Sequence, residues 1–386
     1  MLAKTQSLMA KSKKFKNAIL QIHLWLGLAT GLVVFIVSVT GCIYVFEEEI
    51  RDLTQKDKLY VPVQQKPFVG LAPIIENYKK ASKNAKLTTI RINNARPDAT
   101  VIVSGGKKND YYFNPYTAEL VTKAKPDWLH VDEDLHRTLL LGEPGKFIMN
   151  WSVVIFVIML ISGWVLWFPN QMRLLRQSLT IKWNASFKRV NYDLHNVLGF
   201  YSSWILIIVA LSGLYFGFDS VKKGATFLTG TKLTKPVSVA ATAKPFSQDS
   251  LPQRYDQIYS AAMLQYPGAK ETALSIRKTG ELRLRIIYPS EFSRKQNVFY
   301  FDPATMQMSK YKLYRNFKLA DKLESSNYDL HTGQMFGLFG KILAFIASLI
   351  SASLPVTGLI IWLKKKKKTK KKKVIRVLKR EPALTV

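Results

Sequence analysis

Residues 193–218 read DLHNVLGFYSSWILIIVALSGLYFGF, a histidine followed by an almost unbroken apolar run. The first long apolar stretch of the chain opens in the same way at His23. In both stretches, glycines follow 4 and 18 residues after the histidine, His23 or His195. A helix rises 1.5 Å per residue, so 18 residues cover about 27 Å, close to the roughly 30 Å hydrocarbon core of a bilayer. Both stretches are therefore predicted to be membrane-spanning helices with a histidine near one end.

Four such apolar runs alternate with polar segments along the 386 residues. Hydrophobic residues make up 48% of the chain, yet its mean hydropathy is 0.00 because the polar segments balance the apolar runs. Each run is long enough to cross a bilayer. We therefore expect an integral membrane protein built on a four-transmembrane-helix bundle.

The net charge of +31 is distributed as in an oriented membrane protein. Residues 1–17 hold five lysines and no acid, the loop 169–192 holds five Lys or Arg and no acid, and the tail after Leu363 holds twelve Lys or Arg. The positive-inside rule then places both termini and this loop in the cytosol. The tail is expected to contact anionic lipid of the bilayer, and no nucleic acid partner is expected.

The two long segments on the opposite side have the pattern of soluble α+β domains. In the first, a helix is predicted over 71–81, with strands at 88–92, 100–104, 111–113 and 119–122. In the second, a helix over 251–265 is followed by strands near 271–277, 281–288 and 298–301. Each segment then ends in Asp-Leu-His, at 134–136 and 329–331.

The order of helix, outer domain and helix thus occurs twice, which indicates a tandem duplication. Glycines stand 6 and 27 residues after both His136 and His331, which adds to the match. The expected segments are a cytosolic basic arm (1–17), helix 1 (18–46), outer domain 1 (47–146), helix 2 (147–168), a cytosolic loop (169–194), helix 3 (195–218), outer domain 2 (219–335), helix 4 (336–363) and a cytosolic Lys-rich tail (364–386).

These residues resemble the PepSY-associated transmembrane proteins of bacteria, also called iron-regulated membrane proteins. The resemblance runs from His23 to Trp362. It is carried by the His-x3-Gly helix starts, the Phe-(Asn/Asp)-Pro-x-Thr turns at 113–117 and 301–305, and Leu-His followed by Gly before helices 2 and 4. It implies a multi-pass protein of the bacterial inner membrane with two periplasmic PepSY-like domains. Members of this family include reductases that bind haem through histidines and release iron from siderophores in the periplasm.

The duplication matches four of the five histidines in two pairs. The predicted orientation puts His23 and His195 near the cytosolic interface, and His136 and His331 near the outer one. Haem iron commonly takes axial histidines, so we expect two haem b groups, one ligated by each pair. The alternative is that histidines at a membrane interface only anchor the helices.

Several other residues keep two interpretations at this stage. Gly27 and Gly31 after His23, and Gly199 and Ser203 after His195, are expected to leave room for a porphyrin, although Gly27-x3-Gly31 is also a helix-packing motif. His130 has no counterpart in the second half and is interpreted as a surface or substrate-adjacent residue. The aspartates before the histidines either orient an imidazole or cap a helix; they are Asp134, Asp193 and Asp329.

The expected function is haem-mediated electron transfer across the membrane to a periplasmic acceptor such as a ferric siderophore. No Gly-x-Gly-x-x-Gly follows a strand, so the electrons are expected from a separate cytosolic donor or from quinol. The competing interpretation is a membrane-anchored binding or regulatory protein without redox activity. A transporter is disfavoured, because no charged residue stands mid-span.

Overall fold

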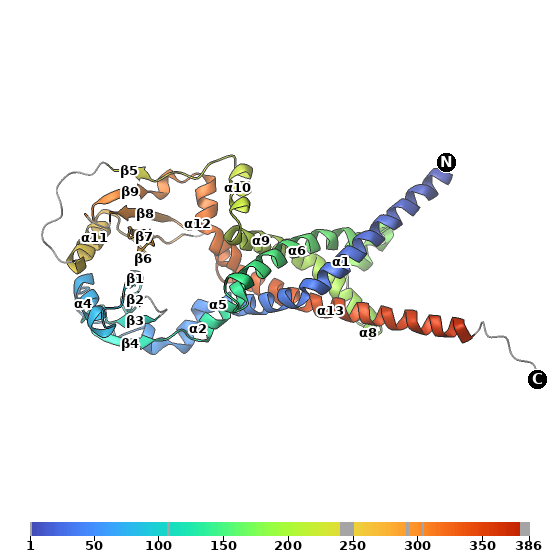
Figure 1. Ribbon diagram of the computed structural model, residues 1–386, viewed down its shortest axis with the longest axis horizontal. Coiled ribbons are helices and arrows are strands. Elements are labelled where there is room, and N and C mark those ends of the chain that lie inside the picture. The colour runs from blue at the N-terminus through green and yellow to red at the C-terminus, as the bar shows by residue number, and fades with distance from the viewer. Residues whose placement is uncertain (1, 106–108, 240–250, 291–292, 303–304, 379–386) are drawn as a thin grey trace, which may run out of the picture.

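The computed structural model describes residues 2–105, 109–239, 251–290, 293–302 and 305–378. It consists of a helical bundle with a β-sheet region at one end (Figure 1). The start of the first helix and the end of the last one both project from the opposite end of the bundle. The sheet therefore lies at one end of the bundle, and the start of α1 (Leu2–Tyr44) and the end of α13 (Gly337–Leu378) lie at the other.

Four helical segments are long and apolar enough to cross a membrane, at Lys14–Tyr44, Glu143–Trp167, Phe187–Gly217 and Gln334–Lys365. The first belongs to α1 (Leu2–Tyr44), which continues through most of the expected basic arm. The others are α6 (Glu143–Trp167), the continuous helix formed by α8 (Phe187–Asp193), η2 (Leu194–Leu198) and α9 (Gly199–Gly217), and α13 (Gly337–Leu378). They form a ring, in which α1 packs against α6 and α13, and α9 packs against the same two helices.

The first outer segment folds as its hydrophobic pattern predicts. Its helix α4 spans Leu71–Ala81, and it is followed by β1 (Leu87–Asn93), β2 (Val101–Gly105), β3 (Asp110–Phe113) and β4 (Leu120–Ala124). The turn after Phe113 is closed by a bond from Ala118 N to Asn114 O of 3.0 Å. Helix α5 (Trp128–Thr138) then leads into the bundle, where it packs against α1 and α6.

The second outer segment has the same order of elements. Helix α11 (Leu251–Gln265) precedes β6 (Glu271–Ile276), β7 (Leu282–Ile287), β8 (Gln296–Phe301) and β9 (Met308–Lys312). Two residues of the expected turn at 301–305 lie outside the described residues. Helix α12 (Leu319–Thr332) returns the chain to the bundle, where it packs against α9.

The sequence predicts two outer domains, but the two outer units share one nine-stranded antiparallel sheet. Its order is β4-β3-β2-β1-β6-β7-β8-β9-β5, with β5 (Val237–Ser238) on one edge. Strand β1 pairs with β6 in the centre, with Ile90 opposite Leu274. Both halves then bury side chains in one hydrophobic core beneath α4 and α11. Pairing at β1 and β6 removes two exposed sheet edges, which would otherwise invite association with other chains.

Short elements complete the connections. Between the first span and the sheet lie α2 (Glu47–Thr54) and α3 (Lys56–Leu59). The remaining elements are η1 (Met172–Leu174), α7 (Leu175–Leu179), α10 (Asp219–Leu228), η3 (Tyr314–Asn316) and η4 (Gln334–Phe336). The buried ammonium of Lys341 joins α13 to α2 through both carboxylate oxygens of Glu49, at 2.8 and 3.0 Å. This ion pair ties the sheet-side end of the bundle together.

Candidate functional site

Each of the four histidines predicted as ligands faces a Ser-Gly or Thr-Gly pair on a neighbouring helix. Their Nδ1 atoms lie within 2.8–3.0 Å of a hydroxyl oxygen. The glycine after each hydroxyl residue meets the imidazole Cε1 edge. The four sets are His23 with Ser162 and Gly163, His136 with Thr40 and Gly41, His195 with Thr357 and Gly358, and His331 with Ser212 and Gly213. One arrangement therefore occurs four times, always within one half of the chain.

The hydroxyl groups determine which ring nitrogen carries the proton. Each hydroxyl already donates to a backbone carbonyl of its own helix; Ser212 Oγ, for example, donates to Val209 O at 2.8 Å. The equivalent bonds of Ser162, Thr40 and Thr357 run to Met159, Ile36 and Ser353. Since the hydroxyl proton is used there, its oxygen accepts a bond from Nδ1–H of the histidine. Nε2 is then the unprotonated nitrogen, the form in which imidazole binds a metal.

The outer pair, His136 and His331, comes from two different helices, α5 and α12. Their ring centres are 6.2 Å apart. Both line a cavity of about 590 Å³ on the sheet side of the bundle, together with Gly41 and Gly213. The two ring planes are tilted by 68° to each other. Both imidazoles can therefore contact one group bound in this cavity.

The inner pair, His23 and His195, lies toward the other end of the bundle. His195 stands in the π-helical turn Leu194–Leu198, where α8 passes into α9. Such single π turns insert one extra residue into a helix and occur often at functional sites, because they redirect a side chain. Here the turn accompanies the approach of His195 to Gly358.

The small residues expected to make room beside the inner histidines pack against other helices instead. A Cβ at Gly27 would lie 2.9 Å from Met159 Cε, and one at Gly31 would lie 3.3 Å from Pro355 Cβ. Gly199 meets Leu354, and Ser203 accepts a bond from Trp164 Nε1. These positions lie in helix–helix contacts, as the packing interpretation of Gly27-x3-Gly31 predicts. The space beside each histidine comes from the glycine on the facing helix.

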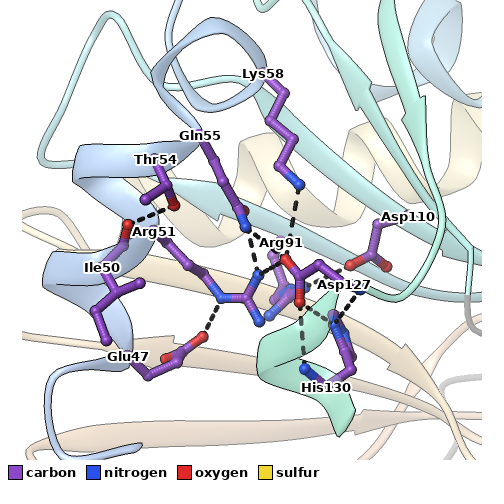
Figure 2. Close-up of polar contacts among 10 residues, drawn as sticks. All are labelled: Glu47, Ile50, Arg51, Thr54, Gln55, Lys58, Arg91, Asp110, Asp127 and His130. Carbon is purple, nitrogen blue, oxygen red and sulfur yellow. Dashed lines mark hydrogen bonds and ion pairs between the residues drawn. The ribbon is translucent and has the colours of Figure 1, made fainter. Parts of the chain in front are cut away.

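Figure 2 shows what positions the helix that carries His136. Asp127 precedes α5 and accepts two hydrogen bonds from the α2 region. One comes from Arg51 Nη1 on α2 (2.8 Å), and the other from Nε2 of Gln55, the residue that follows α2 (2.5 Å). The other oxygen of Asp127 accepts from His130 N at 3.2 Å, and the two residues form a capping box. Burial opposes ionisation, but the bonds from His130 and Gln55 and the charge of Arg51 lower the pKa of Asp127. His130 thus belongs to the cap of α5 and is not part of the histidine pairs.

The helix that carries His331 is held by a different set of groups. Asp321 is buried at the start of α12 and accepts bonds from Lys318 N (2.9 Å) and Lys312 Nζ (2.6 Å). It also accepts from Thr234 N at 3.0 Å. Both outer histidines are therefore positioned by a carboxylate that joins their helix to the rest of the outer region.

The aspartates that precede the histidines in the sequence take other partners. Asp193 accepts from Arg189 Nε at 2.9 Å and from Lys182 N at 3.2 Å. Asp329 forms a two-bond pair with Arg294, at 2.6 and 3.1 Å. Neither of these two orients an imidazole. Ser162, Thr40, Thr357 and Ser212 do so, and the signal for them is the Ser or Thr before each matched glycine.

The donor set suits a cofactor that needs two protein ligands. Within the described ranges, no three His, Cys, Asp or Glu side chains gather as one metal site. A structural zinc site would need about four such ligands, whereas haem iron takes one or two from the protein. Burial and the charge of His331 lower the pKa of His136 to about 4, and burial lowers the pKa of His331. Both imidazoles are therefore neutral at pH 7 with Nε2 available, and the residues fit a bis-histidine haem.

Comparison with known proteins agrees with the resemblance noted in the sequence. Residues 20–365 match the family described as the PepSY-associated TM region. The matched range includes three transmembrane candidates completely and the first from residue 20, together with the shared sheet and the four histidines. No curated protein matches the chain.

Proposed function

The chain belongs to the PepSY-associated transmembrane family, and from this premise we propose that it transfers electrons across a membrane through two haem groups. His136 and His331 would hold one haem b, and His23 and His195 the other. Bound haem supplies one-electron redox chemistry at its iron. The observation that carries the proposal is the fourfold arrangement in which a hydroxyl occupies Nδ1 and leaves Nε2 for a metal.

The residues of the chain prepare each site before a cofactor enters. The hydroxyls hold the imidazoles in one tautomer and one orientation, which increases their basicity toward a metal. The facing glycines let each ring lie against a helix backbone, with no side chain between them. Val33, Val37 and Phe156 give part of the outer cavity an apolar lining. Apolar surroundings of this kind would shift the redox potential of a bound haem.

The proposed orientation combines the charge pattern with the fold. The start of α1 and the end of α13 both project from the end of the bundle opposite the sheet. The lysine-rich termini favour the cytosol for that side, so the sheet would face the periplasm of a bacterial inner membrane. Electrons would enter from a cytosolic donor or from quinol and leave at the sheet side. The acceptor we propose is a periplasmic ferric chelate of the siderophore class.

We also propose that the chain arose by tandem duplication. The order of helix and strands in the first outer segment, α4 and β1–β4, recurs as α11 and β6–β9. Each half brings its two histidines to the Ser-Gly or Thr-Gly pairs of that same half. A haem between the halves would then need one ligand from each, which is why we pair His136 with His331 and His23 with His195.

Absorption spectra of the purified protein, oxidised and then reduced, test the proposal. We expect Soret and α bands and two haems per chain by pyridine haemochrome assay. His136→Ala and His331→Ala should each remove the same haem, and the double variant should lose no more than either single. His23→Ala and His195→Ala should behave alike at the other site. Additive losses would refute the pairing. Absence of haem after expression with adequate haem supply would support the binding or regulatory protein instead.

A further inference from the structure

The surface of the shared sheet that faces away from α4 and α11 is basic where the two halves meet. Successive residues of a strand point to opposite faces. Ile90, Leu274 and Leu284 lie in the core under α4 and α11, so their neighbours point the other way. On that opposite face, Arg91 on β1 and Arg285 on β7 stand on either side of Ala273 on β6.

A second row on this face repeats the pattern. Arg283 on β7 stands opposite Ser275, which in turn stands opposite Thr89 on β1. Ala273 and Ser275 are small, so the central strand forms a low floor between taller side chains. Strands two positions apart are separated by roughly 10 Å, so Arg91 and Arg285 flank Ala273 at about that spacing.

Two of these arginines have no acidic partner in contact. Arg285 Nε is buried without a hydrogen-bond partner. No hydrogen bond or ion pair to its guanidinium is found across the described parts of the chain, and Glu271 acts on it only electrostatically. Arg283 donates to Ser275 Oγ at 3.2 Å. Burial and the charge of Arg283 lower the pKa of Arg285. Like charges on neighbouring positions of one sheet face are destabilising, and a bound anion would offset this cost.

Arg91 on this face and Arg294, which precedes β8, are each paired with an acid. Arg91 Nη2 lies 3.5 Å from Asp110, and Arg294 holds Asp329 with two bonds. Strand register places Arg91, Arg283 and Arg285 on one face, and Arg294 precedes β8, the strand that pairs with β7; we refer to these four residues as the arginine cluster. Asp110 and Asp329 are each paired with one of them, and within the described residues no acid contacts Arg283 or Arg285.

The cluster adjoins the outer histidine pair. The guanidinium of Arg294 lies 5.5 Å from the ring centre of Tyr328. Tyr328 lines the cavity that also contains His136 and His331. One aromatic side chain therefore contacts both the arginine cluster and the cavity. A ligand at the arginines would lie near the outer redox site.

We propose that Arg91, Arg283, Arg285 and Arg294 form a binding site for a multiply negative, oxygen-rich chelate of Fe³⁺ with carboxylate or catecholate donors. The guanidiniums donate hydrogen bonds to the outer oxygen atoms of the chelate, a geometry that the planar fork of arginine suits. Ala273 and Ser275 form the floor of the site. The identity of the metal chelate rests on the proposed function, since the site would hold the electron acceptor. Binding itself makes and breaks no covalent bond.

Titration calorimetry of the full-length protein in nanodiscs tests this with redox-inert Ga³⁺ complexes in place of Fe³⁺. We expect Ga³⁺-citrate and a Ga³⁺ tris-catecholate complex to bind, and a Ga³⁺ trihydroxamate complex without negative charge not to bind. Arg283→Gln and Arg285→Gln should each weaken binding at least tenfold. Arg285→Lys, which keeps the charge but not the fork, should weaken it less. Arg277→Gln, at the exposed end of the same hairpin, is the matched control and should bind like the unchanged protein.

Three results would overturn the site. One is equal binding of the trihydroxamate complex, and another is unchanged Ga³⁺-citrate affinity in Arg285→Gln and Arg283→Gln. The third is equally tight binding of inorganic phosphate or free citrate, which would indicate a general anion site such as one for a lipid headgroup. Haem spectra and thermal melting check that each variant is folded. Because the calorimetry needs no haem reduction, a haem-containing protein that fails to bind refutes only the site. A haem-free protein that binds refutes only the proposed electron transfer.

Discussion

The outer and inner histidine pairs share their immediate partners but differ in what holds them. All four rings meet a hydroxyl and a glycine. His23 and His195 stand within the membrane-spanning helical segments themselves. His136 and His331 stand on α5 and α12, which follow the sheet and are fastened at their starts by Asp127 and Asp321. The inner site therefore depends on packing of the bundle, and the outer site also depends on the outer region.

Removing a single hydroxyl should weaken haem binding most at His23. Ser162 is the hydrogen-bond partner of His23 Nδ1, with no second one among the described residues, whereas His331 Nδ1 also lies 2.9 Å from Val209 O. Ser162→Ala should weaken the inner haem about 10- to 100-fold, as loss of a group that orients a ligating histidine typically does. Ser212→Ala should weaken the outer haem less. Haem titration of the apoprotein measures both, and Ser162→Thr is the control that keeps the hydroxyl. Equal losses in the two alanine variants would contradict this difference.

Glycine substitutions should affect the outer haem more than the inner one, which is the reverse of the effect expected for the hydroxyl substitutions. A Cβ at Gly41 would lie 3.2 Å from His136 Cε1, whereas one at Gly163 would lie 3.8 Å from His23 Cε1. The first is a tight contact and the second an ordinary one. Gly41→Ala should therefore shift His136 by a few tenths of an ångström, and reduce outer haem occupancy several-fold. Gly163→Ala should leave the inner haem as it is. Redox titration of each variant gives the number and midpoint potentials of the remaining haems; a loss in Gly163→Ala would show that the inner ring is held more tightly than we infer.

Removing the cap of α5 should disturb only the outer end. Asp127→Ala removes the capping bonds and the ion pair with Arg51. Loss of a helix cap costs about 0.5–2 kcal/mol. We expect a lower melting temperature and a weaker outer haem, with the inner haem unchanged. Asp127→Asn, which retains a capping side chain, should lose less. If the inner haem changed equally, the sheet and bundle would be more strongly coupled than the contacts indicate.

The smallest expected effect concerns a buried carboxyl on α5. Asp132 Oδ2 is buried without a partner, and burial raises the pKa of Asp132 to about 6. Its counterpart four residues before the other outer histidine is Asn327, whose amide donates to Ser212 O at 3.0 Å. A raised pKa in the folded state means that the folded protein favours the protonated carboxyl. The contribution of Asp132 to folding stability is therefore fully present below about pH 4 and is lost as the pH rises through 6.

Asp132→Asn should therefore behave as the parent near pH 4 and be more stable at pH 8, by on the order of 1–2 kcal/mol. Thermal melting in detergent at the two pH values measures this. Asp134→Asn, two residues along α5, serves as the matched change of charge. Between pH 5 and pH 8 the parent protein should lose stability relative to Asp132→Asn. If it does not, Asp132 is not buried as a protonated acid.

Much of the architecture follows from local patterns of residues. The helices Leu71–Ala81 and Leu251–Gln265 begin and end where the apolar spacing predicts. The four spans follow from length and hydrophobicity, because a bilayer demands about 20 apolar residues in a helix whatever surrounds it. The matched spacing of histidines and glycines also singled out the residues that meet in the structure.

The spans, the two long outer helices and seven of the nine strands therefore follow from the sequence by itself, since each depends on a periodicity or a length within one segment. Strands β9 and β5 are not predicted. Tertiary structure alone decided that β1 pairs with β6, which merges two expected domains into one sheet. It also decided that Gly41 faces His136 and not His23, although Gly41 and His23 share a helix. The physical reason is that these contacts depend on which helix or strand becomes the neighbour. That choice minimises exposed edges and unpaired polar groups over the whole chain, and no single segment carries it.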